Sequence, residues 1–151
     1  MTERKAVSIV MYTQHKNNDA VDKCKSFLRS LRRNTKYESY ELIFVDNGSK
    51  AKKQKAFSQK LVKEGVIVVT HDRPLEINES LEKALLITEG NYVFLMTGDT
   101  YVPEYWLSKA LQYFASNNEE EIHCKYGDRI VNGFRKTYDT SKKEVTEKEA
   151  V

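Results

Sequence analysis

Two aspartates follow apolar runs in this sequence, and their positions could support chemistry on a bound ligand. Asp99 ends the stretch YVFLMTGD, in which an apolar run at residues 92–96 gives way to Thr97 and Gly98. Asp46 follows the run YELIFV and opens the sequence DNGS. Long apolar runs are typical of strands covered on both faces, and open α/β sheets bind ligands beyond the carboxyl ends of such strands. Both carboxylates are therefore candidate ligand contacts. The plainer alternative for Asp99 is a turn residue or a helix cap.

The rest of the chain predicts the elements that must position these residues. Apolar runs predict strands at residues 6–12, 40–45, 66–70, 92–96 and 122–126, and helical periodicity fills the first four intervals between them. Successive strand–helix pairs imply a parallel sheet with right-handed crossovers. Asn132-Gly133 then predicts the turn of a C-terminal hairpin. We therefore predict an α/β fold with a mostly parallel sheet, helices on both faces and a C-terminal β-hairpin, in one domain at residues 1–140 followed by a charged tail at 141–151.

The sequence also predicts the caps and the buried faces of the helices. Asn18 or Asp19 should cap the first helix, whose inner stripe is Val21, Cys24, Leu28 and Leu31, and Ser49 should cap a basic second helix. The stripe predicted for the third helix is Ile77, Leu81, Leu85 and Thr88, and Pro103 should lie in the first turn of the fourth. His15, in the loop after the first strand, is expected to be exposed.

Composition limits the broad class of the protein. The chain has 151 residues and 40% hydrophobic content, enough for one core. Its 25 Lys and Arg against 22 Asp and Glu give a net charge of +3, which is too mild to indicate nucleic acid binding. Cys24 and Cys124 lack metal or CxxC spacing. We see no membrane span and no signal peptide, so a reduced, cytoplasmic protein is expected.

Three strand ends carry the polar residues that could meet at one edge of the sheet: Thr13, residues 46–49 and residues 98–99. No GxGxxG follows the first strand and no GxxxxGK[ST] occurs, which argues against dinucleotide oxidoreductases and P-loop proteins. A nucleotidyltransferase is a further alternative, but the loop TQHKNND is not the glycine-rich, basic loop that such an enzyme usually needs.

The blocks VSIVMYT, ELIFVDNGS and ITEGNYVFLMTGDTYVPEYWL resemble the nucleotide-sugar-binding half of a family 2 glycosyltransferase with the GT-A fold. The resemblance runs from Val7 to Tyr138. Thr13 lies where the family's first loop touches the nucleotide base and ribose. Asp46 matches the residue that accepts a hydrogen bond from a uracil-type base, and Asn47, Gly48 and Ser49 match the turn beside it.

The resemblance also implies a divalent metal. Gly98 and Asp99 match the end of the DxD motif, whose last carboxylate holds Mg²⁺ or Mn²⁺ against the sugar-nucleotide diphosphate. Such a metal would neutralise charge that develops on the leaving group. Thr97 stands where the motif has its first carboxylate, so Asp99 alone is expected to bind the metal.

The resemblance implies a glycosyltransferase-like domain that binds a nucleotide-diphospho-sugar, with UDP as the expected nucleotide, for transfer to a glycan, lipid or protein acceptor. In the family, the acceptor site and catalytic base usually follow this half, so a second chain or domain could supply them, and no catalytic residue is assigned. The alternative is a shortened, non-catalytic binding or scaffold module.

Overall fold

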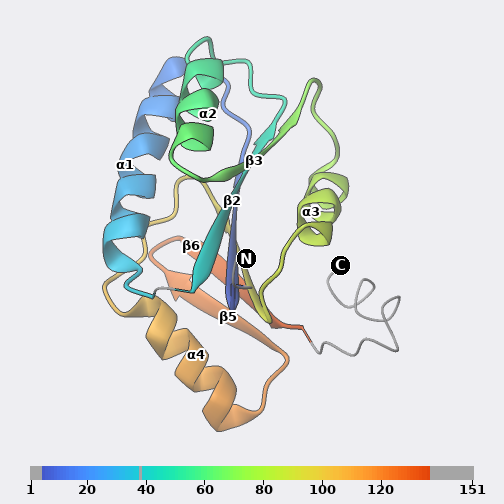
Figure 1. Ribbon diagram of the computed structural model, residues 1–151. Coiled ribbons are helices and arrows are strands. Elements are labelled where there is room, and N and C mark those ends of the chain that lie inside the picture. The colour runs from blue at the N-terminus through green and yellow to red at the C-terminus, as the bar shows by residue number, and fades with distance from the viewer. Residues whose placement is uncertain (1–4, 38, 137–151) are drawn as a thin grey trace.

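The computed structural model describes residues 5–37 and 39–136. A six-stranded sheet forms the centre of this part of the chain (Figure 1). The predicted tail at 141–151 and the predicted domain boundary at residue 140 lie outside these residues. The elements are β1 (Val7–Thr13), α1 (Asn18–Asn34), β2 (Tyr40–Asn47), α2 (Gln54–Lys63), β3 (Ile67–His71), α3 (Ile77–Leu86), β4 (Tyr92–Thr97), α4 (Trp106–Asn117), β5 (Glu121–Tyr126) and β6 (Arg129–Arg135).

The strand order is β3-β2-β1-β4-β6-β5. The pairs among β1, β2, β3 and β4 are parallel, whereas β6 runs antiparallel to both β4 and β5. The predicted α/β class, the mostly parallel sheet and a C-terminal antiparallel pair are thus confirmed. Because β1 lies between β2 and β4, the ends of the three strands singled out by the sequence are neighbours.

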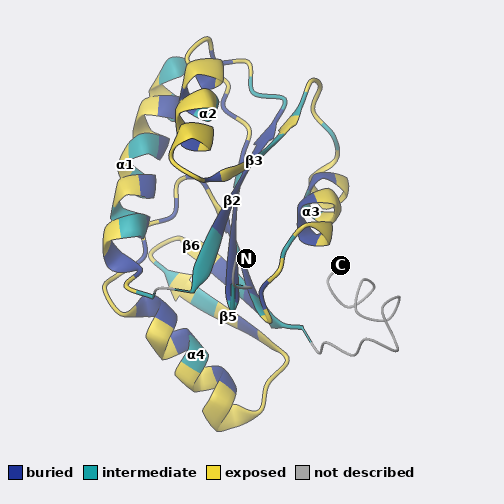
Figure 2. Cartoon of the chain, in the orientation of Figure 1, coloured by how far each residue is buried: buried dark blue, intermediate teal, exposed yellow. Residues whose placement is uncertain are grey.

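Helices cover both faces of the sheet, as predicted (Figure 1). On one face α1, α2 and α4 pack over a large core that includes Phe44, Phe94 and Trp106, and on the other α3 packs over a smaller one around Val10 and Ile43. Dark blue buried residues line the inner side of each helix in Figure 2, and yellow exposed residues line the outer side. Among the described residues, no helix combines the length and apolar character needed to cross a membrane.

The inner face of α1 confirms its predicted stripe, because all four residues are buried. Its cap differs by one residue from the prediction: the Asn17 side chain, rather than that of Asn18 or Asp19, accepts a hydrogen bond from the Ala20 N–H at 2.9 Å. Extended φ and ψ angles at Asn17 place its side-chain oxygen over the free N–H groups of the first turn.

The predicted starts of α2 and α4 are wrong. Ser49 does not cap α2, which begins at Gln54, because the Ser49 hydroxyl instead accepts the His15 N–H at 2.8 Å. Pro103 precedes α4, which begins at Trp106 after Tyr105 in a left-handed conformation. A contact between distant residues therefore displaces the start of α2.

The stripe predicted for α3 is also wrong in part. The residues it buries are Ser80, Ala84 and Leu85, while Ile77 is 52% exposed. α3 is the only described helix on its face of the sheet, so no neighbouring helix covers the rest of its apolar side.

The hairpin forms five residues earlier than predicted. β5 and β6 are joined by Gly127-Asp128, with Gly127 at a φ of +60°, the pattern of a type II′ turn. Asn132 and Gly133 lie within β6. A Cβ at Gly133 would lie 2.7 Å from the Phe94 ring, so this glycine serves close packing in the sheet rather than a turn.

Candidate functional site

The carboxyl ends of β1, β2 and β4 carry most of the predicted site residues. In the parallel register Thr13 is the partner of Asp46, and Tyr12 is the partner of Thr97. A cavity of about 570 Å³ opens at the β1 and β4 ends of this edge. Its walls are the loop after β1, the first turns of α1, residues 97–99 and Arg129 of β6.

Thr13 and Gly98 form the floor of this cavity. The Thr13 hydroxyl donates to the Val45 carbonyl at 2.7 Å and is buried. The Gly98 N–H donates to the Tyr12 carbonyl at 2.9 Å, and a Cβ at Gly98 would lie 2.5 Å from Thr13 Cγ2 and 3.1 Å from Cys24 Sγ. Only glycine allows the end of β4 to approach β1 and α1 this closely.

Cys24, which lines the cavity from α1, is not a nucleophile at neutral pH. Burial and, to a smaller extent, the nearby Asp99 carboxylate raise the pKa of its thiol to about 12. The thiol is therefore protonated, and the thiolate is the form that reacts.

Asp99 stands at the mouth of the cavity with both carboxylate oxygens occupied. The Thr97 hydroxyl donates to Oδ1 at 2.6 Å, and the Arg129 guanidinium forms an ion pair with Oδ2. Partial burial acts to raise the pKa of Asp99, but the hydrogen bonds from Thr97 and Arg129 and the charge of Arg129 outweigh it, so the pKa lies below the ordinary value. Asp99 is therefore an anion at neutral pH.

Arg129 is the site residue that sequence reasoning missed, because it was assigned only to a strand. It lies 30 residues from Asp99, immediately after the turn that joins β5 to β6. Only the pairing of β6 with β4 brings the guanidinium to the end of β4, and no spacing along the chain indicates this contact.

Asp46 and Ser49 belong to a second cavity, of about 500 Å³, at the β2 and β3 ends of the same edge. Asp46 Oδ1 accepts the Ser49 N–H at 3.0 Å. Its Oδ2 atom has no hydrogen-bond partner among residues 5–37 and 39–136, so it is available to a ligand. The structure thus brings Thr13, Gly98 and Asp99 to one cavity and Asp46 and Ser49 to another.

The wall between the two cavities is the loop containing His15. Its N–H donates to the Ser49 hydroxyl, and its carbonyl accepts from the Lys50 and Ala51 N–H groups at 2.8 and 3.2 Å. The His15 ring is buried and hydrogen-bonded to Gln54, so the expectation of an exposed histidine is wrong. The contacts that tie this loop to residues 49–51 also bury the ring.

Asn47 and Gly48 line neither cavity. The fully buried Asn47 amide donates to the Leu75 carbonyl and the Tyr12 hydroxyl, and its oxygen accepts the Leu75 N–H. Gly48 has a φ of +65°, and a Cβ there would lie 2.5 Å from Pro74 N. Both residues hold the segment before α3 against the end of β2, and their predicted donor contacts remain predictions.

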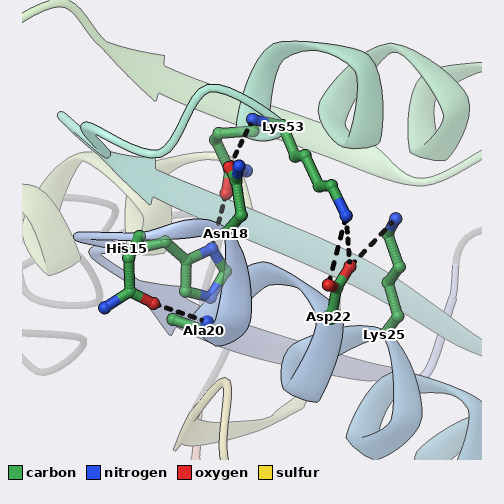
Figure 3. Close-up of polar contacts among 8 residues, drawn as sticks. His15, Asn18, Ala20, Asp22, Lys25 and Lys53 are labelled. Atoms are coloured by element: carbon green, nitrogen blue, oxygen red, sulfur yellow. Dashed lines mark hydrogen bonds and ion pairs between the residues drawn. The ribbon is translucent and has the colours of Figure 1, made fainter.

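A polar network joins α1 to the start of α2 (Figure 3). Asn18 Oδ1 accepts the Lys53 N–H at 3.0 Å, and the Lys53 ammonium pairs with Asp22 at 3.2 Å. Lys25 approaches the same carboxylate at 3.7 Å. These residues do not line the first cavity, and such exposed pairs add little stability.

The oxygen ligands that line the first cavity fit a hard divalent cation in part. Asp99 offers a half-exposed carboxylate, and Mg²⁺ is commonly held by one or two carboxylates with phosphate oxygens and water completing its shell. The described residues contain no group of three or more His, Cys, Asp or Glu that could hold a metal without a ligand. Without a ligand a cation would thus be held weakly, by Asp99 and water; the ligand's own oxygens would complete its shell, and it would share Asp99 with Arg129.

Comparison with known protein families gave a match. Residues 8–148 match the sequence profile of Glycosyl transferase family 2. Comparison with curated proteins gave no match.

Solved structures share the fold at low sequence identity. A mannosyltransferase from Pyrobaculum calidifontis, PcManGT, solved with GDP-Man and Mn²⁺, matches with a TM-score of 0.73 and 14% identity, over 89% of this chain and 46% of that one. TarS from S. aureus, solved with UDP-GlcNAc, matches with a TM-score of 0.61 and 17% identity, over 77% of this chain and 33% of that one. The TarS complex with UDP gives a TM-score of 0.64 at 17% identity, over 77% and 34%. The chain therefore spans between about a third and a half of the length of these three structures.

Proposed function

Because the chain belongs to glycosyl transferase family 2, we propose that it binds the donor of a sugar transfer, a nucleotide-diphospho-sugar, at the carboxyl edge of β2, β1 and β4. The observation that carries this proposal is the position of Asp99 at the mouth of the 570 Å³ cavity, beside the end of β1. The diphosphate lies in this cavity. The structural relatives hold UDP, UDP-GlcNAc or GDP-Man, which supports a nucleotide-sugar ligand.

We assign the nucleoside to the ends of β1 and β2. Thr13 and Asp46 are register partners, so a nucleoside that contacts both residues lies across these two strands. Asp46 Oδ2 accepts a hydrogen bond from the base, and the N3–H of uracil, the base that the family resemblance implies, can donate it; guanine also presents an N–H, so UDP and GDP are compared below. Because the His15 loop separates the two cavities, the nucleoside passes over this loop.

Asp99 is the metal ligand in this proposal. When bound, Mg²⁺ or Mn²⁺ supplies positive charge that stabilises the leaving diphosphate. Asp99 is already ionised at neutral pH, because Thr97 and Arg129 lower its pKa. The carboxylate therefore needs no proton loss before it binds a cation.

Calorimetry with UDP and GDP, in Mn²⁺ and in EDTA, tests the proposal. We expect UDP to bind more tightly than GDP and to lose affinity in EDTA. Asp99→Asn should remove the metal-dependent part of the UDP affinity and keep the fold. Asp22→Asn is the matched control, because Asp22 has a similar side-chain exposure (48% against 47%), is also ion-paired and does not line the cavity. Equal UDP affinity in Mn²⁺ and EDTA would remove the metal assignment, and no binding of either nucleotide would overturn the donor site.

A non-catalytic donor-binding module is the second candidate. Asp19 and Asp99 are the only carboxylates that line the first cavity among the described residues, and Asp99 is paired with Arg129. Donor binding is common to both candidates, so turnover is the measurement that separates them.

A further inference from the structure

Arg129 lines the first cavity from the start of β6, and its guanidinium pairs there with Asp99. Its backbone is fixed because Arg129 pairs with Tyr126 across the hairpin. Tyr126 in turn packs edge-on against the buried Trp106 ring, with centroids 6.5 Å apart. The guanidinium therefore extends from a strand position that the packing of Tyr126 on Trp106 holds rigid.

Most of the hydrogen-bonding capacity of this guanidinium is unused. Arginine has five N–H donors, and Asp99 is the one hydrogen-bond partner that Arg129 has in the described part of the chain. Its side chain is 51% exposed, so the remaining donors can reach a ligand in the cavity. A planar guanidinium is well suited to bind phosphate through two parallel N–H···O bonds.

The charges on the cavity wall are balanced, and a bound nucleotide-diphospho-sugar would change that balance. Asp19 and Asp99 oppose Lys23 and Arg129. A cation at Asp99 would compete with the Arg129 guanidinium, because both positive charges need the same carboxylate. A diphosphate in the cavity would provide new acceptors for the guanidinium within the same volume.

We propose that Arg129 binds the diphosphate of the donor and competes with the divalent cation for Asp99. In the free protein the guanidinium rests on Asp99; in the donor complex it donates to phosphate oxygens. This inference rests on the proposed function and adds a ligand-binding residue from β6, outside the three strand ends that the sequence singled out.

The competition gives Arg129→Gln opposite effects on two ligands. Without nucleotide, Mn²⁺ should bind about two- to fivefold more tightly than to the wild-type chain, which is the range expected when an exposed ion pair no longer holds the carboxylate. In saturating Mn²⁺, UDP should bind about tenfold more weakly or worse, because a charge-assisted contact to phosphate is lost. Arg129→Lys should recover part of the UDP affinity.

Electron paramagnetic resonance of free Mn²⁺ measures the first effect, and calorimetry with UDP measures the second, both on the 151-residue chain. Arg135→Gln is the matched control: Arg135 is on the same strand, donates to Asn118 and lies outside the cavity. It should change neither affinity.

Three outcomes would overturn the inference. Unchanged affinities in Arg129→Gln would show that Arg129 contacts neither ligand, while the donor site itself would stand. A loss of affinity for both Mn²⁺ and UDP would assign Arg129 a structural role only. Failure of the wild-type chain to bind UDP would overturn the proposed function, and this inference with it.

Discussion

Asp46 and Asp99 lie at the same edge of the sheet, at the ends of β2 and β4 on either side of β1, yet their surroundings differ. Asp99 is half-exposed and paired with a cation, whereas Asp46 is 6% exposed and bonded to a backbone N–H. The Asp99 carboxylate, already paired with Arg129, can exchange that partner for a metal. Asp46 has no cation to exchange, which favours a fixed hydrogen bond to a neutral ligand group.

Asp46→Ala is therefore expected to affect the nucleotide and not the metal. A hydrogen bond to a charged group contributes about 1.5–3 kcal/mol, so UDP should bind about 10- to 150-fold more weakly at 25 °C. Calorimetry with UDP and with pyrophosphate, both in Mn²⁺, checks this, and pyrophosphate should bind as it does to the wild-type chain. If the variant weakened Mn²⁺ binding as much as Asp99→Asn does, the two roles would have been assigned wrongly.

At the scale of elements, the hairpin shows how a tertiary contact overrides a local turn signal. Asn-Gly is a strong turn sequence, but Gly133 is needed where the Phe94 ring presses on β6. Gly127 then provides the positive φ that the turn requires. A glycine at a close approach and a glycine in a turn look alike in a sequence.

Gly133→Ala and Gly127→Ala distinguish these two uses. At Gly133 the new methyl group would overlap the Phe94 ring, so we expect the free energy of unfolding to fall by about 1–3 kcal/mol. At Gly127 nothing lies within 4 Å, so only the cost of a positive φ remains, about 1–2 kcal/mol. Urea unfolding followed by circular dichroism measures both. An unchanged free energy of unfolding in Gly133→Ala would contradict the packing explanation.

The elements themselves were predictable because their signals are local. Apolar runs and helical stripes are carried by consecutive residues, so the order of four strand–helix pairs and the inner face of α1 follow from the sequence. The start of α2, the buried face of α3 and the position of the turn depend on contacts between distant residues. The residues of the candidate site differ in the same way. The positions of Thr13, Asp46 and Asp99 could be predicted from strand ends, whereas Arg129 reaches the site only because β6 pairs with β4.

Asn47 shows why matching a motif does not by itself assign a contact. It follows Asp46 in DNGS, but its amide is used entirely within the chain, on Leu75 and Tyr12. Removing it would leave the backbone N–H and carbonyl of Leu75 without these partners, a structural cost that could be mistaken for a loss of ligand binding.

At the scale of the molecule, the described residues build the sheet, its two cores and one edge with two cavities. Sugar transfer makes a further demand, because an acceptor hydroxyl must be held in line with the anomeric carbon. Positioning of this kind can supply about 7–11 kcal/mol of barrier lowering. An inverting reaction also needs a base within hydrogen-bond reach of that hydroxyl.

The 151-residue chain is therefore expected to bind the donor but to transfer sugar poorly. Of the two carboxylates on the first cavity, Asp99 is committed to Arg129 or a metal, and Asp19 lies at the first turn of α1 on the donor side. Neither is positioned by a surrounding network that would hold an acceptor, so slow hydrolysis is the most we expect.

The measurement is donor turnover with a panel of sugar and polyol acceptors, with Asp99→Asn as the inactive control and Asp22→Asn as the neutral one. Turnover at or above about 1 s⁻¹, the lower part of the usual enzyme range, would defeat this prediction. It would mean that the chain completes an acceptor site beside β5 and β6 or that a second copy supplies one, and turnover that rises with the square of protein concentration would identify the second copy.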